Sequence, residues 1–225
     1  MPDPASAAGA GPGRVQPRVR AVVLAAGAAR RFGGEKLLAE LHGRPVLQHV
    51  LDRLAEAGIE DPLVVVAPDH AALRTALTLR RARLVVNPSP GDGLSSSLRV
   101  GWDAAVADEP PPDAILVLLG DQPLVRPAVV RALVTAALDS SRPIVAPRYA
   151  SGGGRNPVRI ERSAAHLVLS VSGDRGLGPV IDTRPDLVRE IDVPGTNPDI
   201  DRPTDLEAIR GAEGVGDGPV ATDLA

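Results

Sequence analysis

The sequence predicts an α/β fold in which helices cover both faces of a mostly parallel, mixed β-sheet. Short apolar runs alternate along the chain with segments whose apolar residues recur at helical spacing, a pattern typical of such sheets. Polar motifs follow four of the predicted strands, at the edge where open α/β sheets bind ligands. The chain has 225 residues, of which 44% are hydrophobic and 24% charged, so it is long enough for one sizeable core.

The individual elements follow from periodicity and from turn residues. The first helix, for example, has Val46, Val50 and Leu54 on one face, starts at a proline and stops at a glycine. The predicted strands span residues 20–24, 63–67, 83–86, 114–119, 143–147, 158–161 and 187–193. The predicted helices span residues 45–58, 69–80, 94–107 and 126–138, and a terminal helix is expected to follow a cap at Thr204 or Asp205.

Composition narrows the classes of function. The net charge of −3 and the 1% aromatic content argue against a nucleic-acid surface, which needs a basic face and stacking rings. The chain has no cysteine, and its four histidines show no ligand spacing, so a zinc site is not expected. No apolar run approaches the roughly 20 residues of a membrane span. We therefore expect a cytoplasmic protein without a membrane partner.

The two ends of the chain differ in composition from its middle. Residues 1–19 are rich in Pro, Gly and Ala and lack the apolar centre of a signal peptide, so we expect a disordered tail. Residues 211–225 are Gly-rich and acidic, which indicates a flexible C-terminal tail. Residues 20–210 are expected to form a single domain.

The loop after the first strand combines small residues with positive charge. Backbone N–H groups can face a ligand there because three small residues follow the strand, namely Ala25, Ala26 and Gly27. Arg30, Arg31 and Lys36 add positive charge, so a triphosphate is the expected ligand. Lys36 is the single lysine among 25 basic residues, which indicates that a compact ammonium group is required at this position.

Carboxylates follow two later segments. The apolar strand at 114–119 brings Asp121 to the rim of the sheet, where we expect little else nearby to neutralise its charge. Mg²⁺ would do so, because it takes oxygen ligands from one or two carboxylates and from substrate phosphates. Asp121 could instead cap a helix, but the prolines that follow place the cap several residues later. Alternation puts Asp199 and Asp201 on one face, so either can supply the second carboxylate.

A cluster of small polar residues opens the third predicted helix. Within segment 91–99, the candidate binding residues are Gly93, Ser95 and Ser96. Free N–H groups and hydroxyls at the start of a helix suit the base and α-phosphate of a nucleotide. Any one of these serines is more simply explained as a helix cap, so only the cluster is informative.

Taken together, the motifs resemble the MobA-like nucleotidyltransferases, in particular the molybdenum cofactor cytidylyltransferase branch. Residues 25–36 resemble the family signature A-A-G-x-x-x-R-F-G-x-x-K. Further motifs resemble those of the family in the same order, at Asn87-Pro88, 93–99, 120–123, Asn156-Pro157, 173–176 and 199–206. The resemblance implies a three-layer Rossmann-like nucleotidyltransferase fold.

The resemblance also implies an activity and a set of roles. The activity is Mg²⁺-dependent transfer of CMP from CTP to the phosphate of molybdopterin, with release of pyrophosphate and a molybdoenzyme as recipient. Catalysis is implied for Arg31, Lys36 and Asp121, and metal binding for Asp121 and Asp201. Nucleotide binding is implied for Ala25, Ala26, Gly27, Arg31, Lys36, Asn87, Gly93, Ser95 and Ser96. Acceptor binding is implied for Arg155, Asn156, Pro157 and Asp174.

Four arginines are expected around the acceptor loops, as a phosphate-bearing acceptor requires: Arg148, Arg155, Arg159 and Arg175. The chain departs from the family pattern nearby, where Leu177 and Pro179 replace the usual Ala-Arg continuation, and this puts the acceptor in doubt. Ala29 replaces a small polar residue, which weakens a phosphate contact, and Arg202 stands where Thr is common.

Three other functions remain open. The first is a MobA-like transferase with another nucleotide or acceptor, although Ala26, where guanylyl-transferring relatives resemble A-G-G, favours a pyrimidine. The second is an NAD(P)H-dependent oxidoreductase on the same fold, but the first strand is not followed by G-x-G-x-x-G. The third is a non-catalytic cofactor chaperone, which would not need two carboxylates for a metal.

Overall fold

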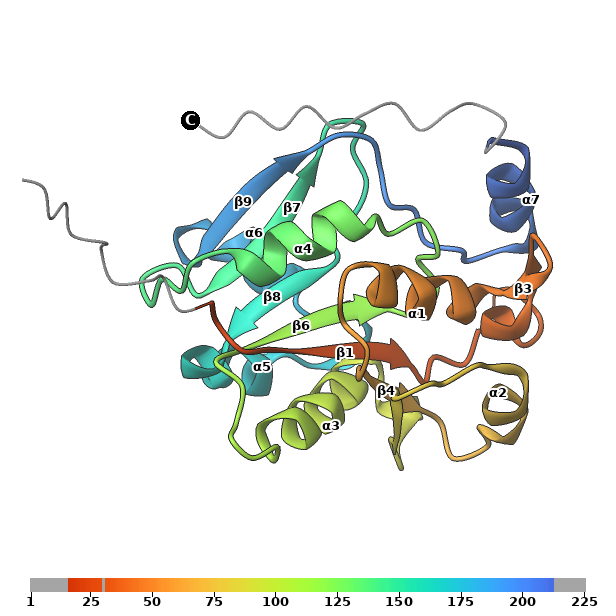
Figure 1. The fold of residues 1–225 in the computed structure, drawn as a ribbon, viewed down its shortest axis with the longest axis horizontal. Helices are drawn as coiled ribbons and strands as arrows, with labels where there is room; N and C mark the ends of the chain where they lie inside the picture. Colours follow the sequence, from red (N-terminus) through yellow and green to blue (C-terminus); the bar gives the residue numbers. More distant parts are fainter. Residues whose placement is uncertain (1–15, 30, 213–225) are drawn as a thin grey trace, which may run out of the picture.

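The computed structural model describes residues 16–29 and 31–212, in which seven strands form one sheet between two layers of helices (Figure 1). The strand order is β5-β4-β1-β6-β8-β7-β9. β8 runs antiparallel to its neighbours β6 and β7, and the other pairs are parallel. The predicted mostly parallel, mixed sheet is therefore confirmed. The strands are β1 (Val19–Ala25), β4 (Leu63–Val66), β5 (Arg83–Val86), β6 (Ala114–Leu119), β7 (Ile144–Tyr149), β8 (Val158–Glu161) and β9 (Val188–Val193).

Alternate side chains of β1 face the two helical layers. Val22 and Leu24 pack with α3, α5 and α6, whereas Ala21 and Val23 pack with α1 and α4. Burial on both faces explains why the central strands are almost entirely aliphatic. The helices are α1 (Val46–Glu56), α2 (Ala71–Ala76), α3 (Leu94–Val106), α4 (Pro127–Thr135), α5 (Ala165–Ser170), α6 (Gly178–Thr183) and α7 (Pro203–Ala212). The three-layer arrangement is thus as predicted.

Two predicted helices end earlier than expected, in each case because of a distant partner. α2 stops before Leu77, whose backbone is extended, and the next N–H donates to Oε1 of Gln48 at 2.8 Å. α4 stops before Ala136, and the guanidinium of Arg159 donates to the carbonyl oxygens of Ala136 and Ala137. Neither partner lies near the helix in sequence, so the local pattern overestimates both lengths.

Four short α-helices and strands of the described chain were not predicted. They are the helices α5 and α6 and the hairpin of β2 (Glu40–Leu41) and β3 (Arg44–Pro45). Each helix has six residues and each hairpin strand has two. Elements of this length complete too few turns or alternations to produce a detectable period.

A third apolar cluster joins the hairpin to the C-terminal helix α7. Leu41 and Val46 pack there against Ile200, Leu206 and Ile209. Segments near the two ends of the described chain are therefore held together, as Figure 1 also shows for α7 and β3. Among the described helices, none combines the length and apolarity that crossing a bilayer would need.

The single domain at residues 20–210 stays a prediction. Of the two predicted tails, residues 1–15 and 213–225 lie outside the described residues. Inside those limits, β1 already begins at Val19 and α7 continues to Ala212.

Candidate functional site

A cleft of about 550 Å³ lies at the carboxyl ends of β1 and β6. These strands are parallel neighbours in which Leu24 pairs with Leu119, so the segments that follow them leave the sheet side by side. Gly120 makes the close approach feasible: its N–H donates to the carbonyl oxygen of Leu24 at 2.9 Å, and an added Cβ would lie 3.2 Å from that oxygen. The topology thereby brings the first loop and Asp121 together.

The first loop forms one wall of the cleft. All the small residues predicted to bind a nucleotide line it, namely Ala25, Ala26 and Gly27. Ala25 and Ala26 are buried, whereas a Cβ added at Gly27 would meet nothing within 4 Å. The N–H groups of Phe32 and Gly33 both donate to the carbonyl oxygen of Ala29, so the loop forms a tight turn here. Arg30, which was also predicted to add positive charge to this loop, lies outside the described residues.

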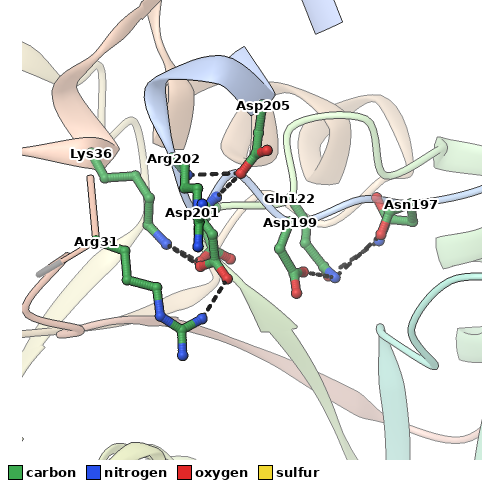
Figure 2. A network of polar contacts seen from close by, with 9 residues as sticks. Arg31, Lys36, Gln122, Asn197, Asp199, Asp201, Arg202 and Asp205 are labelled. Carbon is green, nitrogen blue, oxygen red and sulfur yellow. Dashed lines mark hydrogen bonds and ion pairs between the residues drawn. The ribbon is translucent and has the colours of Figure 1, made fainter. Parts of the chain in front are cut away.

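Four charged side chains meet at the mouth of this cleft. Nζ of Lys36 lies 2.6 Å from Oδ2 of Asp121 and 3.4 Å from Oδ1 of Asp201. Arg31 donates to Oδ2 of Asp201 at 3.2 Å, and Figure 2 shows both cations pointing toward this carboxylate. Little positive charge was expected near Asp121, and this expectation was wrong because Lys36, 85 positions away in the sequence, pairs with it.

The segment before α7 holds Asp201 in place. The N–H of Ile200 donates to the carbonyl oxygen of Asp121 at 3.0 Å. Oδ2 of Asp205 accepts from the N–H groups of Asp201 and Arg202 at 2.8 and 2.7 Å, and these bonds lower the pKa of Asp205. Asp205 lies in the first turn of α7, and its side chain caps the helix by accepting from the preceding backbone. It is one of the two residues that were predicted as the cap.

Asp199 also lines the cleft, but its environment differs from that of Asp201. Nε2 of Gln122 donates to its Oδ1 at 2.5 Å. Desolvation raises the pKa of Asp199, and the neighbouring charge of Asp121 raises it further. Asp201, by contrast, pairs with the cations of the first loop. The choice of Asp201 over Asp199 as a metal ligand stays a prediction.

The carboxylates fit a hard divalent cation that also binds a substrate. Oδ1 of Asp121 is buried and has no hydrogen-bond partner among the described residues. Within the same residues, no group of three or more His, Cys, Asp or Glu side chains gathers to hold a metal ion. Oxygen ligands from one or two carboxylates, completed by phosphates, are typical of Mg²⁺. The donor set is therefore suited to a metal that arrives with a nucleotide.

The start of α3 forms the opposite wall of the cleft, through Gly93 and Ser97. The other predicted polar residues here hold the helix start together. Asn87 donates to the hydroxyls of Ser96 and Ser97 at 2.8 and 3.0 Å, and Ser96 in turn donates to the carbonyl oxygen of Gly93. Ser95 is buried. Contact of Asn87, Ser95 and Ser96 with a nucleotide stays a prediction. Ser97 lines the cleft but was not predicted, because the sequence does not distinguish it from the two serines before it.

A second cavity of about 340 Å³ adjoins the cleft and shares Leu24, Leu94 and Leu119 with it. Two of the predicted acceptor residues, Arg155 and Asn156, line this cavity. Pro157 is buried behind them, and Asp174 lines the first cleft instead. The predicted acceptor residues thus lie around the junction of the two cavities.

The predicted cluster of four arginines is only partly present. Arg155 and Arg175 line the second cavity. Arg159 is completely buried in the sheet, where desolvation lowers its pKa and Glu161 lies 3.7 Å away. Arg148 is exposed and paired with Asp192. Arg159 was therefore wrongly placed near the acceptor, because the alternating pattern of β8 does not reveal which face is fully enclosed.

An open, mostly parallel sheet with a cleft of about 550 Å³ at the carboxyl ends of its strands is typical of nucleotide-binding α/β proteins. Residues 21–188 match the MobA-like NTP transferase domain, and the chain belongs to this family.

Relatives within the family carry different names. The chain is 30% identical to a probable molybdenum cofactor guanylyltransferase of Pyrococcus horikoshii. The match covers 59% of this chain and only 63% of the relative's length. It is 32% identical to nicotine blue oxidoreductase of Paenarthrobacter nicotinovorans over 78% of this chain and 87% of the relative.

Solved structures share the fold of this chain. The crystal structure of Rv0371c from Mycobacterium tuberculosis has a TM-score of 0.75 and 28% identity, covering 88% of this chain and all of that one. A manganese complex of the same protein has a TM-score of 0.70 and 29% identity, covering 87% and 98% of the two chains.

Proposed function

We propose that this protein is a Mg²⁺-dependent nucleotidyltransferase that moves CMP from CTP to the phosphate of molybdopterin and releases pyrophosphate. The observation that carries the proposal is the contact of Lys36 with both Asp121 and Asp201 beside the first loop. A cation and two carboxylates beside a loop of small residues suit a metal-bound triphosphate. Binding a nucleotide without reaction would not need this arrangement.

The mechanism relies on alignment and on neutralisation of charge. The first loop, Arg31 and Lys36 hold the triphosphate, and Asp121 and Asp201 would hold Mg²⁺. Bound Mg²⁺ would supply neutralisation of the phosphate charge that develops during transfer. The acceptor, held in the second cavity, directs a phosphate oxygen in line at the α-phosphorus, so orientation accounts for much of the rate. A phosphate nucleophile is already ionised, so no general base is required.

CTP is the proposed donor because of the first loop. Ala26 lines the cleft and is only 4% exposed. Its methyl group leaves less space than the glycine found at this position in the A-G-G sequence that the guanylyl-transferring relatives resemble. Exclusion by the wall of a pocket is worth only a few kcal/mol, so we expect a preference for CTP over GTP of roughly 10- to 200-fold.

Direct competition tests this proposal. The protein, Mg²⁺ and molybdopterin are mixed with equal CTP and GTP, and the dinucleotide product is identified by mass. A cytosine dinucleotide supports the proposal. A guanine dinucleotide would leave the transferase assignment standing but would refute the base preference.

The similarity to nicotine blue oxidoreductase favours a second candidate, an NAD(P)H-dependent oxidoreductase. The same mixtures distinguish it, because oxidation of NAD(P)H without any dinucleotide would replace the transferase proposal. A molybdoenzyme recipient and a cytoplasmic location stay predictions.

A further inference from the structure

A pair of buried amides lies beside the carboxylates. Gln122 directly follows Asp121, and Asn197 lies two residues before Asp199; their exposed fractions are 3% and 2%. Nδ2 of Asn197 donates to Oε1 of Gln122 at 3.1 Å, and Nε2 of Gln122 approaches the carbonyl oxygen of Asn197 at 3.4 Å. Figure 2 shows the two side chains facing each other. The pair thus joins two segments that are 75 positions apart.

The pair is connected to both cavities. On one side, Nε2 of Gln122 donates to Oδ1 of Asp199, which lines the first cleft. On the other side, Nδ2 of Asn197 donates to the carbonyl oxygen of Asn156 at 3.2 Å, and Asn156 lines the second cavity. The hydroxyl of Tyr149 donates to the same carbonyl oxygen at 2.9 Å. A continuous hydrogen-bond path therefore leads from Asp199 to the loop of the second cavity.

The amide at position 122 makes this connection because it both donates and accepts. Its oxygen accepts from Asn197 while its nitrogen donates to Asp199, and a carboxylate or an apolar side chain of similar size offers only one of these functions or neither. Because the groups are buried, a missing partner costs more than an exposed hydrogen bond would. The position of Asp199 therefore depends on the position of the Asn156 loop.

We propose that Gln122 is a positioning residue that couples the nucleotide cleft to the acceptor cavity. An acceptor that orders the Asn156 loop also orders Asp199 beside the bound nucleotide, and the reverse follows because coupling between two sites is reciprocal. This inference rests on the proposed transfer between two substrates.

The test compares Gln122→Met, which keeps the volume but cannot form the path, with a matched control. Gln48→Met is the control, because Gln48 is a buried glutamine with two hydrogen bonds and lines neither cavity. For each variant, the melting temperature, the CTP affinity in Mg²⁺ without acceptor, the KM for the acceptor and kcat are measured. We expect Gln122→Met to change the CTP affinity less than about threefold but to lower kcat/KM for the acceptor about tenfold or more. Gln48→Met should lower only the melting temperature.

A double-mutant cycle isolates the path. In an Asp199→Ala background, Gln122→Met should lower kcat/KM for the acceptor much less than it does in the wild type, because the connection is already broken. Equal losses in both backgrounds, or a Gln122→Met protein with wild-type acceptor kinetics, would overturn the coupling alone. A wild-type protein that binds CTP but forms no dinucleotide would instead overturn the proposed function and the coupling with it.

Discussion

The side chain of Lys36 is 12% exposed and lies between two carboxylates, where its small ammonium group reaches both. The planar fork of arginine is larger and spreads its donors, so it would displace one carboxylate. We expect Lys36→Arg to lower kcat/KM almost as much as Lys36→Ala. Steady-state kinetics with CTP check this, and Arg44→Lys, a swap at an exposed ion pair with Asp52, should leave kcat/KM unchanged. Wild-type activity in Lys36→Arg would contradict the requirement for an ammonium group.

Asp121 presents one oxygen to Lys36 and keeps a buried second oxygen without a partner among the described residues. Asp121→Asn retains the volume but removes the charge, so we expect turnover to fall by more than tenfold, above ~1.4 kcal/mol in transition-state stabilisation, while the protein stays folded. Pyrophosphate release is measured beside a melting curve. Asp103→Asn, on the exposed face of α3, serves as the control. A loss below tenfold would show that Asp121 is not a metal ligand.

At the scale of elements, the start of α3 depends on Gly93. Its φ is 91°, and an added Cβ would lie 2.5 Å from the carbonyl carbon of Gly173 and 2.7 Å from Oδ1 of Asp174. The segment at Gly173 and Asp174 therefore packs directly against the start of α3 because position 93 has no side chain.

Gly93→Ala should destabilise the fold by about 1–3 kcal/mol and also weaken CTP binding, because the new methyl group displaces the segment at Gly173. Urea unfolding and a CTP titration measure the two effects. Gly91→Ala is the matched control, since Gly91 also lines the cleft but a Cβ there meets nothing within 4 Å. Similar losses in both variants would mean that the close contact is not the cause.

At the scale of the whole molecule, the segment before α7 brings Asp201 to a cleft lined mainly by the first half of the chain. Leu206 is 5% exposed and packs in the cluster that also contains Leu41 from the hairpin. The cap formed by Asp205 then positions the backbone of Asp201. Placement of the second carboxylate therefore depends on apolar packing between segments that are distant in sequence.

Leu206→Ala should cost about 2–5 kcal/mol of unfolding free energy. It should also raise the Mg²⁺ concentration needed for half-maximal activity, because α7 no longer holds Asp201 firmly. Denaturant unfolding and a Mg²⁺ titration of turnover check both effects. Glu207→Ala, an exposed neighbour on the same helix, should change neither. If the folded Leu206→Ala variant needs the same Mg²⁺ concentration as the wild type, the packing of α7 does not affect the proposed metal site.

Local sequence pattern was sufficient to predict the sheet, its principal helices, the first loop and the place of Asp121. Strand alternation, helical period and turn glycines each act over only a few residues. Contacts between distant segments decided the rest. The partnership of Lys36 with Asp121, the burial of Arg159 and the pairing of Gln122 with Asn197 join residues that no short-range pattern connects. Hydrogen bonds and ion pairs require only that two groups meet in space, and that meeting is set by how the layers pack. For this reason the residue types that line the cleft could be predicted from the sequence, whereas the contacts between these residues required the folded chain.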